Sequence, residues 1–160
     1  MGRAVAGAVG RSSQQSDRQE QPINFQVITL KPLVGGRHAN GDRVQRLKVY
    51  QLAFKLAMEI FKESKHFPKE ETYSLIDQIR RSSRSVLANI GEGYRKKLYP
   101  RMFVSKMADA DGEATETQVW LDLATACEYL SEKRRLELVA GYEEVGRMLG
   151  GMIAHPEKFS

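Results

Sequence analysis

The chain has 160 residues, which is enough for one domain with a hydrophobic core. Apolar residues make up 41% of it and charged residues 28%, a balance that argues against a wholly disordered chain. The net charge of +5 favours an anionic partner, such as nucleic acid or an acidic membrane surface.

Cysteine usage and hydropathy limit the classes of protein further. Cys127 is the only cysteine, so the chain has no internal disulfide framework and no thiolate cluster for zinc. The apolar runs are a few residues long, far below the ~20 residues of a membrane-spanning helix. The N-terminus also lacks the strongly apolar stretch of a secretory signal. We therefore expect a cytoplasmic protein that does not associate with membranes.

The first part of the chain differs in residue composition from the rest. Residues 11–22, RSSQQSDRQEQP, are polar and low in complexity, and the residues after 30 are rich in turn formers. INFQVITL at 23–30 alternates weakly, but one short strand cannot bury itself. We predict a largely disordered or weakly structured tail over 1–44, a folded domain over 45–155 and a short C-terminal tail over 156–160.

Helical periodicity dominates from Gln45 onward and predicts four helices, over about 45–65, 69–93, 100–130 and 132–153. Pro68 and Pro100 suit helix starts, and Gly91 and Gly93 predict the end of the second helix. The first helix is apolar over a wide face, with one row at Leu47, Tyr50, Phe54, Ala57 and Phe61 and a flanking row at Leu52, Leu56 and Ile60.

The other three helices each carry one core row. The rows are Ile76, Ile79, Ser83, Val86 and Ile90 in the second helix, Phe103, Met107, Ala110, Ala114, Thr117, Leu121 and Ala124 in the third, and Leu138, Tyr142, Val145, Leu149 and Met152 in the fourth. Spacings of three and four are typical of helices that pack nearly parallel or antiparallel at about 20°. Short connections then predict an all-α fold, an antiparallel up-down four-helix bundle.

The stretch RRSSRSVLANIGEGYRK at 80–96 combines small residues with cations. Small side chains let a neighbouring backbone come close, and the third helix has small residues as well, so we predict close approach of these two helices. The small residues are Ser82, Ser83, Ser85, Ala88 and Gly91 in the second helix and Ala108, Ala110, Gly112 and Ala114 in the third. We interpret the serines as packing residues, not as nucleophiles.

Cations occupy the opposite side of this helix and the following loop. They are Arg80, Arg81, Arg84, Arg95, Lys96, Lys97 and Arg101, while Glu92 is the only acidic residue between 80 and 101. Tyr94 and Tyr99 lie among them and offer rings that stack on exposed bases. The pattern predicts a basic stripe that binds phosphates. The alternative is an ordinary solvated face, offset by the acidic residues Asp109, Asp111, Glu113 and Glu116 of the third helix.

The chain contains three segments that bear on its family, LKVYQLAFKLAMEIFKESKHFP, QIRRSSRSVLANIGEGYRK and GEATETQVWLDLATACEYLSE. In sequence and in order they resemble the 23S ribosomal RNA intervening-sequence proteins, and the resemblance covers about 46–155. It implies an up-down four-helix bundle that assembles as a homopentamer. Related accessory proteins of diversity-generating retroelements form similar basic pentamers that bind nucleic acid and a reverse transcriptase, so a protein partner is also implied.

Within these segments, Asn89, Glu92, Gly93 and Arg95 match the family's most distinctive positions. Near a helix end, Asn89 and Glu92 can bond unsatisfied backbone groups or pair with arginines. We therefore assign Asn89, Glu92 and Gly93 a structural or interface role rather than a catalytic one.

No enzyme class is indicated. The three histidines, His38, His66 and His155, are not at metal-ligand spacing, and GEG is not a phosphate-binding glycine loop. No nucleophile has an identifiable base partner. The acidic residues of the third helix fit a solvated or interface-facing charge run better than a cation site. We expect no catalytic residue, no metal and no cofactor.

A second apolar row, Trp120, Leu123, Cys127 and Leu130, runs along the third helix. It either widens the core or forms an interface between subunits, and the family resemblance favours the interface.

Together these features predict a non-catalytic, basic, oligomeric bundle that associates with nucleic acid, preferably RNA, through phosphate contacts. The competing hypothesis is a scaffold that binds a partner protein, with no nucleic-acid binding at physiological salt. A third, an enzyme with a site in the bundle core, needs converging buried polar groups that the sequence does not supply.

Overall fold

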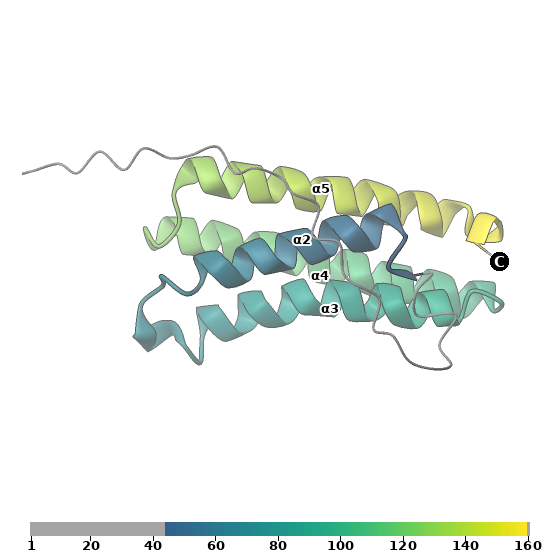
Figure 1. The fold of residues 1–160 in the computed structure, drawn as a ribbon, viewed down its shortest axis with the longest axis horizontal. Helices are drawn as coiled ribbons and strands as arrows, with labels where there is room; N and C mark the ends of the chain where they lie inside the picture. Colours follow the sequence, from purple (N-terminus) through teal and green to yellow (C-terminus); the bar gives the residue numbers. More distant parts are fainter. Residues whose placement is uncertain (1–43, 160) are drawn as a thin grey trace, which may run out of the picture. The chain divides into compact units, whose positions relative to one another are not determined.

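The computed structural model describes residues 44–159, and all of its regular elements are helical (Figure 1). The α-helices are α2 (Lys48–Glu63), α3 (Leu75–Arg95), α4 (Pro100–Ala126) and α5 (Glu132–Ala154), and the 3-10 helices are η1 (Lys69–Glu71) and η2 (Pro156–Phe159). The tail predicted for residues 1–44 lies outside the described residues, apart from Val44.

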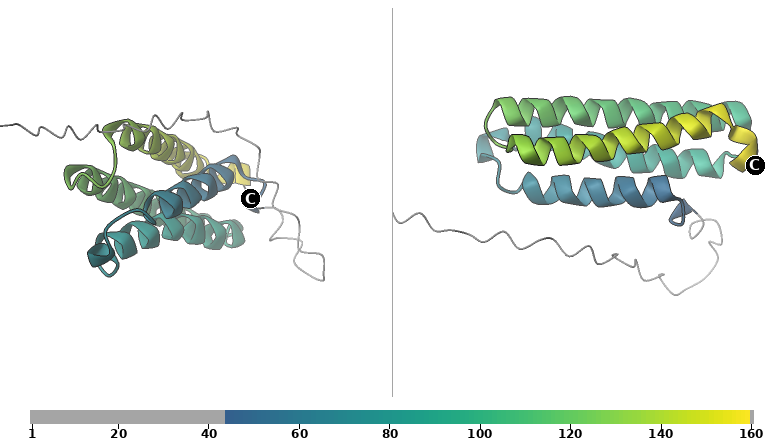
Figure 2. Two further views of the ribbon diagram at one scale, coloured as in Figure 1. Left: turned by 60° about the vertical axis from the view of Figure 1, so that its left-hand side comes forward. Right: turned by 90° about the horizontal axis from the view of Figure 1, so that it is seen from above.

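The four α-helices form an antiparallel up-down bundle, as predicted (Figures 1 and 2). Helices that are consecutive in the chain pack against each other. Helix α2 also packs against α5, so each of the four helices has two neighbours in the bundle. One end of the bundle therefore holds the start of α2, the α3–α4 connection and the end of α5. The other end holds η1 and the α4–α5 connection.

The core rows predicted for α3, α4 and α5 are confirmed. Every member of the three rows is buried, from Phe103 to Ala124 on α4 and from Leu138 to Met152 on α5. Ser82 and Ser83 are buried as well, where α3 meets α4. The hydroxyls of Ser82 and Thr117 lie 2.9 Å apart across this contact, so the small polar residues here serve packing.

The row predicted for α2 is wrong in part. Its buried residues are Val49, Ala53, Leu56, Ala57 and Ile60, so the row predicted as flanking supplies more of the core. Tyr50, Phe54 and Phe61 from the predicted main row are only partly buried. Apolar residues surround most of this helix, and periodicity alone therefore does not select the side that faces its neighbours.

Helix α3 differs from the prediction at both ends. It begins at Leu75 rather than near 69, because η1 comes first and the Glu71 carboxylate accepts hydrogen bonds from the Ser74 hydroxyl and, at 3.3 Å, from the Leu75 amide. It also continues through Gly91 and Gly93 to Arg95, so the predicted glycine stop is wrong. Gly93 is buried against α4, and a β-carbon placed on it would lie 2.9 Å from Cβ of Lys106. This glycine allows close helix contact instead of ending the helix.

The segment predicted as a C-terminal tail continues the fold to residue 159. Residues 156–159 form η2, and the Phe159 ring stacks on the Phe103 ring with centroids 5.7 Å apart. An aromatic side chain at the end of the chain thus covers the start of α4.

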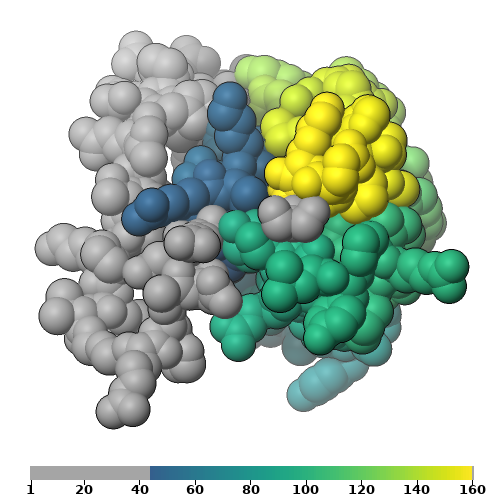
Figure 3. Space-filling model, turned by 90° about the vertical axis from the view of Figure 1, so that its right-hand side faces the viewer, coloured from purple at the N-terminus to yellow at the C-terminus, as the bar shows by residue number. Residues whose placement is uncertain are grey.

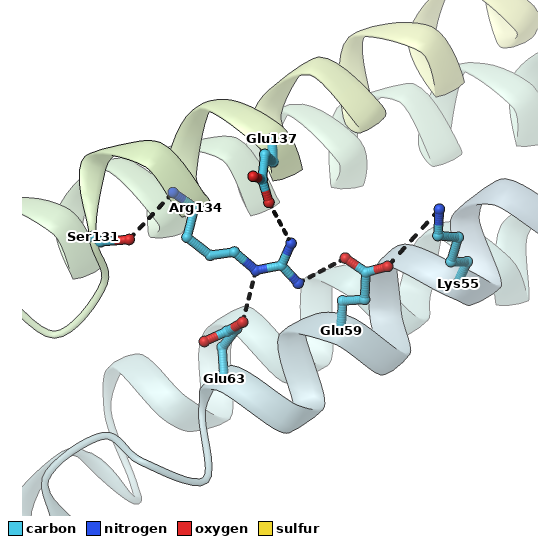
Figure 4. Close-up of polar contacts among 6 residues, drawn as sticks. All are labelled: Lys55, Glu59, Glu63, Ser131, Arg134 and Glu137. Atoms are coloured by element: carbon cyan, nitrogen blue, oxygen red, sulfur yellow. Dashed lines mark hydrogen bonds and ion pairs between the residues drawn. The ribbon is translucent and has the colours of Figure 1, made fainter. Parts of the chain in front are cut away.

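Helices α2 and α5 are joined by an ion-pair network around Arg134, the Arg134 network (Figure 4). The Arg134 guanidinium donates to Glu63 and Glu59 of α2, both at 2.7 Å, and to Glu137 at 2.8 Å. Burial lowers the pKa of Arg134, but the three carboxylates outweigh burial, so the pKa lies above its ordinary value. The Ser131 hydroxyl accepts from the Arg134 amide and caps α5.

Candidate nucleic-acid interface

The cations predicted to form one stripe lie in three separate places. Arg81 and Arg84, the outer-face pair, are exposed on α3. Arg95, Lys96, Lys97 and Arg101, the basic tip, lie at the end of α3 and the start of α4. Arg80 belongs to neither group.

Arg80 turns toward α2 and is not part of a stripe. Its Nε donates to the Ser64 hydroxyl at 2.7 Å, and its guanidinium lies 5.0 Å from the centroid of the Phe61 ring. Consecutive residues of a helix point 100° apart, so Arg80 and Arg81 meet different neighbours. Arg80 therefore stabilises the α2–α3 contact.

The outer-face pair lines a shallow hollow whose charge is partly offset. The hollow is lined by Asp77, Arg81, Arg84, Ser85 and Ala88 of α3. Asp77 brings a carboxylate to the same hollow, and the charge of Arg81 acts on Glu113 of α4. This part of the surface matches the alternative of a solvated face with neighbouring acidic residues.

An acidic hollow lies beside this pair, where α3 meets α4. It is lined by Asn89, Ala108, Asp109, Gly112, Glu113 and Glu116. Burial raises the pKa of Glu113, the negative charge of Glu116 raises it further, and Arg81 acts in the opposite direction. Such a surface repels phosphate groups. An anionic ligand on α3 is therefore kept from extending across this hollow onto α4.

The basic tip differs because its charges are not offset. None of its four cations forms an ion pair with any residue between 44 and 159, whereas Lys106, Arg134, Arg135 and Arg147 are all paired. Among the tip cations, Lys97 alone has an aromatic contact with the described residues, with its Nζ 5.4 Å from the centroid of the Tyr94 ring. The tip therefore gathers four cations that no carboxylate of the described residues engages.

The backbone holds the basic tip in a hydrogen-bonded turn. The Lys96 amide donates to the Gly93 carbonyl at 2.8 Å, and the Tyr99 amide donates to the Lys96 carbonyl at 2.8 Å. The Tyr99 carbonyl then accepts from the amide of Phe103, the first buried residue of α4, at 3.0 Å. Figure 3 faces this end of the bundle, where the green surface around residue 100 lies beside the yellow C-terminal end. The cations are thus carried by ordered backbone.

Asn89 and Glu92, which match distinctive positions of the family, both contact Lys106 of α4, a residue that sequence reasoning missed. Its Nζ lies 3.1 Å from Asn89 Oδ1 and 3.0 Å from Glu92 Oε2, and it also pairs with Asp109 at 3.4 Å. The hydrogen bond to Glu92 raises the pKa of Lys106 above its ordinary value. Asn89, Glu92 and Gly93 thus fasten the last turns of α3 to α4, directly below the basic tip.

The second apolar row of α4 is divided in the structure. Leu130 is buried, and Trp120 packs partly against the core while its Nε1 donates to Glu116 at 3.0 Å. Leu123 and Cys127 are exposed. Two members therefore widen the core, and the other two remain on the surface of the chain.

Two negative findings concern residues 44–159. Their His, Cys, Asp and Glu side chains form no group of three or more that is arranged to hold a metal ion. None of the helices in this part of the chain is both long and apolar enough to cross a bilayer.

Comparison with known proteins shows the family of the chain. A model of the 23S rRNA-intervening sequence protein family matches residues 45–151. A crystal structure of a protein of unknown function from the S23 ribosomal protein family of Bacteroides thetaiotaomicron is 27% identical, with a TM-score of 0.60 over 66% of this chain and 97% of that one. A search of the curated proteins gives no match. The chain belongs to the 23S rRNA-intervening sequence protein family.

Proposed function

We propose that this protein is a non-catalytic, cytoplasmic factor that associates with nucleic acid through phosphate contacts at the basic tip. The observation that supports this most strongly is the clustering of Arg95, Lys96, Lys97 and Arg101 at one connection, with no ion pair to any of them within residues 44–159. The family's description refers to an insertion in 23S rRNA, which favours RNA over DNA as the ligand.

Unpaired cations suit this role for an electrostatic reason. A phosphate that binds Arg95 or Lys96 displaces only mobile counterions, and their release favours binding at low salt. A phosphate that binds Arg134 has to replace carboxylates that already hold the guanidinium at 2.7 Å. Contacts of this kind read the backbone and not the base sequence.

The outer-face pair has a secondary role in this proposal. Arg81 and Arg84 are exposed, but Asp77 and Glu113 lower the positive potential around them. They extend the contact along α3 once the basic tip has bound. Arg80 takes no part because it is engaged with Ser64 and Phe61.

Assembly would multiply the contacts. The resemblance of the sequence implies a homopentamer, and Val119, Leu123 and Leu136 are exposed apolar residues that suit contacts between copies. Several basic tips in one particle raise the apparent affinity for a long RNA through a high effective concentration. Light scattering coupled to size-exclusion chromatography measures the number of subunits directly.

The experiment compares two triple variants of equal net charge. One removes charge at the basic tip, Arg95→Gln/Lys96→Gln/Arg101→Gln, and the other removes it at the opposite end of the bundle, Lys62→Gln/Lys65→Gln/Lys69→Gln. Fluorescence anisotropy measures the binding of a structured RNA and a duplex DNA across a salt series. We expect the tip variant to bind at least ~10-fold more weakly at physiological salt with a flatter salt slope, because it lost phosphate contacts.

Two outcomes would contradict the proposal. Equal losses in both triple variants would show that net charge, and not the basic tip, attracts the nucleic acid. An absence of binding by the wild type at physiological salt would favour the alternative, a scaffold that binds a partner protein.

A further inference from the structure

Tyr99 is an exposed aromatic side chain fixed at the centre of the basic tip. Its side chain is 64% exposed, and its ring has no aromatic or cation contact with the described residues. It is the N-cap residue of α4, and hydrogen bonds on both its amide and its carbonyl hold its backbone. An aromatic ring on ordered backbone loses little conformational entropy when a ligand covers it.

Tyr94, the other aromatic residue of this region, does not offer the same surface. It is partly buried, and Lys97 Nζ lies over its ring. The cation therefore covers one face of a ring that is already partly buried. Only Tyr99 offers a ring without such a contact, and Lys96 and Arg101 stand on either side of it in the chain.

A free ring between cations favours one class of nucleic acid. A duplex hides the faces of its bases within the stack, so an exposed ring adds nothing to its binding. A single strand, a loop or a bulge presents a base face that stacks on an aromatic ring while its phosphates meet the adjacent cations. We propose that residues 94–102 bind unpaired nucleotides, with one base stacked on Tyr99 and the flanking phosphates held by Lys96 and Arg101. This inference rests on the proposed function and narrows its ligand.

An anionic membrane surface is the other ligand that matches exposed apolar and basic residues. Leu98 is 72% exposed and Met102 is 49% exposed, both next to the cations. A helix that binds a membrane surface presents a continuous apolar face to the lipid. Here residues 96–99 form a turn, and Phe103 of the following helix points into the core. The apolar surface is too small and too interrupted for that role, and nucleic acid is the better match.

The test uses Tyr99→Ser, with Tyr99→Phe as the variant that keeps the ring. Serine is a favoured N-cap residue, so Tyr99→Ser preserves the start of α4. Tyr73 is a matched control because it is 94% exposed in the connection between η1 and α3, away from the basic tip, and Tyr73→Ser removes the same ring there. Circular dichroism confirms that each variant is folded.

Anisotropy compares a fluorescent 12-nucleotide single-stranded RNA of mixed sequence with a blunt duplex of the same length, at physiological salt. We expect the wild type to prefer the single strand and Tyr99→Ser to bind it roughly 5- to 100-fold more weakly, as for the loss of one stacked base. Tyr99→Phe and Tyr73→Ser should bind like the wild type, and duplex affinity should be the same in all four proteins.

Four results would overturn the inference, and they are distinguishable. If the duplex binds as tightly as the single strand, or if Tyr99→Ser binds like the wild type while the tip triple variant binds weakly, stacking is refuted and the proposed function stands. If the wild type binds neither RNA, the proposed function fails as well. Binding to vesicles of phosphatidylserine and phosphatidylcholine, lost in Tyr99→Ser and without RNA binding, would assign the tip to a membrane surface.

Discussion

Gly93 of α3 lies against Met107 of α4 with no room for a side chain between them. A methyl group on Gly93 would meet the end of the Met107 side chain and would lie 2.9 Å from Cβ of Lys106. Met107 is fully buried and Lys106 Cβ is fixed to its backbone, so neither atom can move aside freely. This contact sets the distance between the two helices just below the basic tip.

We expect Gly93→Ala to destabilise the bundle by about 1–3 kcal/mol, the usual cost of overpacking a core, despite the better helix propensity of alanine. Gly91→Ala is the matched control, because a β-carbon there meets nothing within 4 Å. It should stabilise the fold by up to about 1 kcal/mol. Urea denaturation followed by circular dichroism measures both, and two changes of the same sign would contradict the packing argument.

The Arg134 network predicts a loss of stability that depends on salt. Arg134→Ala leaves Glu59, Glu63 and Glu137 near one another without their shared cation, and we expect a loss of about 1–2 kcal/mol at low salt. Part of that loss should disappear in 1 M salt because screening weakens the interactions among the charges.

Arg147→Ala serves as the control for Arg134→Ala. Within the described part of the chain, Arg147 pairs only with Glu144 of its own helix, and it is mostly exposed, so its removal should cause no measurable change. Equal effects of the two substitutions in thermal denaturation would show that the Arg134 network does not join α2 to α5.

Glu71 makes the stability of the bundle sensitive to acid. The hydrogen bond from the Ser74 hydroxyl, followed by that from the Leu75 amide, lowers the pKa of Glu71. A lowered pKa means that ionised Glu71 stabilises the folded state at neutral pH, and that this contribution is lost as the pH falls through the lowered pKa. Glu71→Gln should therefore be less stable than the wild type near neutral pH, by a difference that shrinks on acidification.

Urea denaturation in steps from about pH 7 to about pH 2 measures this difference. Glu70→Gln removes the same charge from an exposed carboxylate that makes no hydrogen bond within residues 44–159, and should have the smaller effect. A difference between Glu71→Gln and wild type that stays constant across the series would show that Glu71 acts through its shape and not its charge.

Sequence periodicity predicted the core of α4 and α5 residue by residue because spacings of three and four run unbroken along each buried row. It did not select the buried side of α2, where Leu52, Phe54 and Phe61 are apolar on other sides of the same helix. Gly93 shows a different limit, because a glycine permits both a helix end and a close contact. The choice between them depends on Met107, which is distant in sequence.

The candidate site shows the same limit for charges. The sequence identified a cluster of cations, but the partners that occupy them lie on other helices. Arg80 donates a hydrogen bond to Ser64, and Lys106 of α4 binds Asn89 and Glu92 of α3. Such pairs depend on the direction of each side chain and on the packing of the bundle. The basic tip was predicted as part of a stripe, and only the structure separated it from the paired charges around it.

The most direct test of the central claim is lysine footprinting of the wild-type chain with and without a structured RNA. Acetylation followed by mass spectrometry compares Lys96 and Lys97 at the basic tip with Lys62, Lys65 and Lys69 at the opposite end, in one sample. The proposed function predicts that RNA protects Lys96 and Lys97 while the other three lysines react as before. Equal reactivity at both ends, or protection confined to Lys62, Lys65 and Lys69, would contradict it.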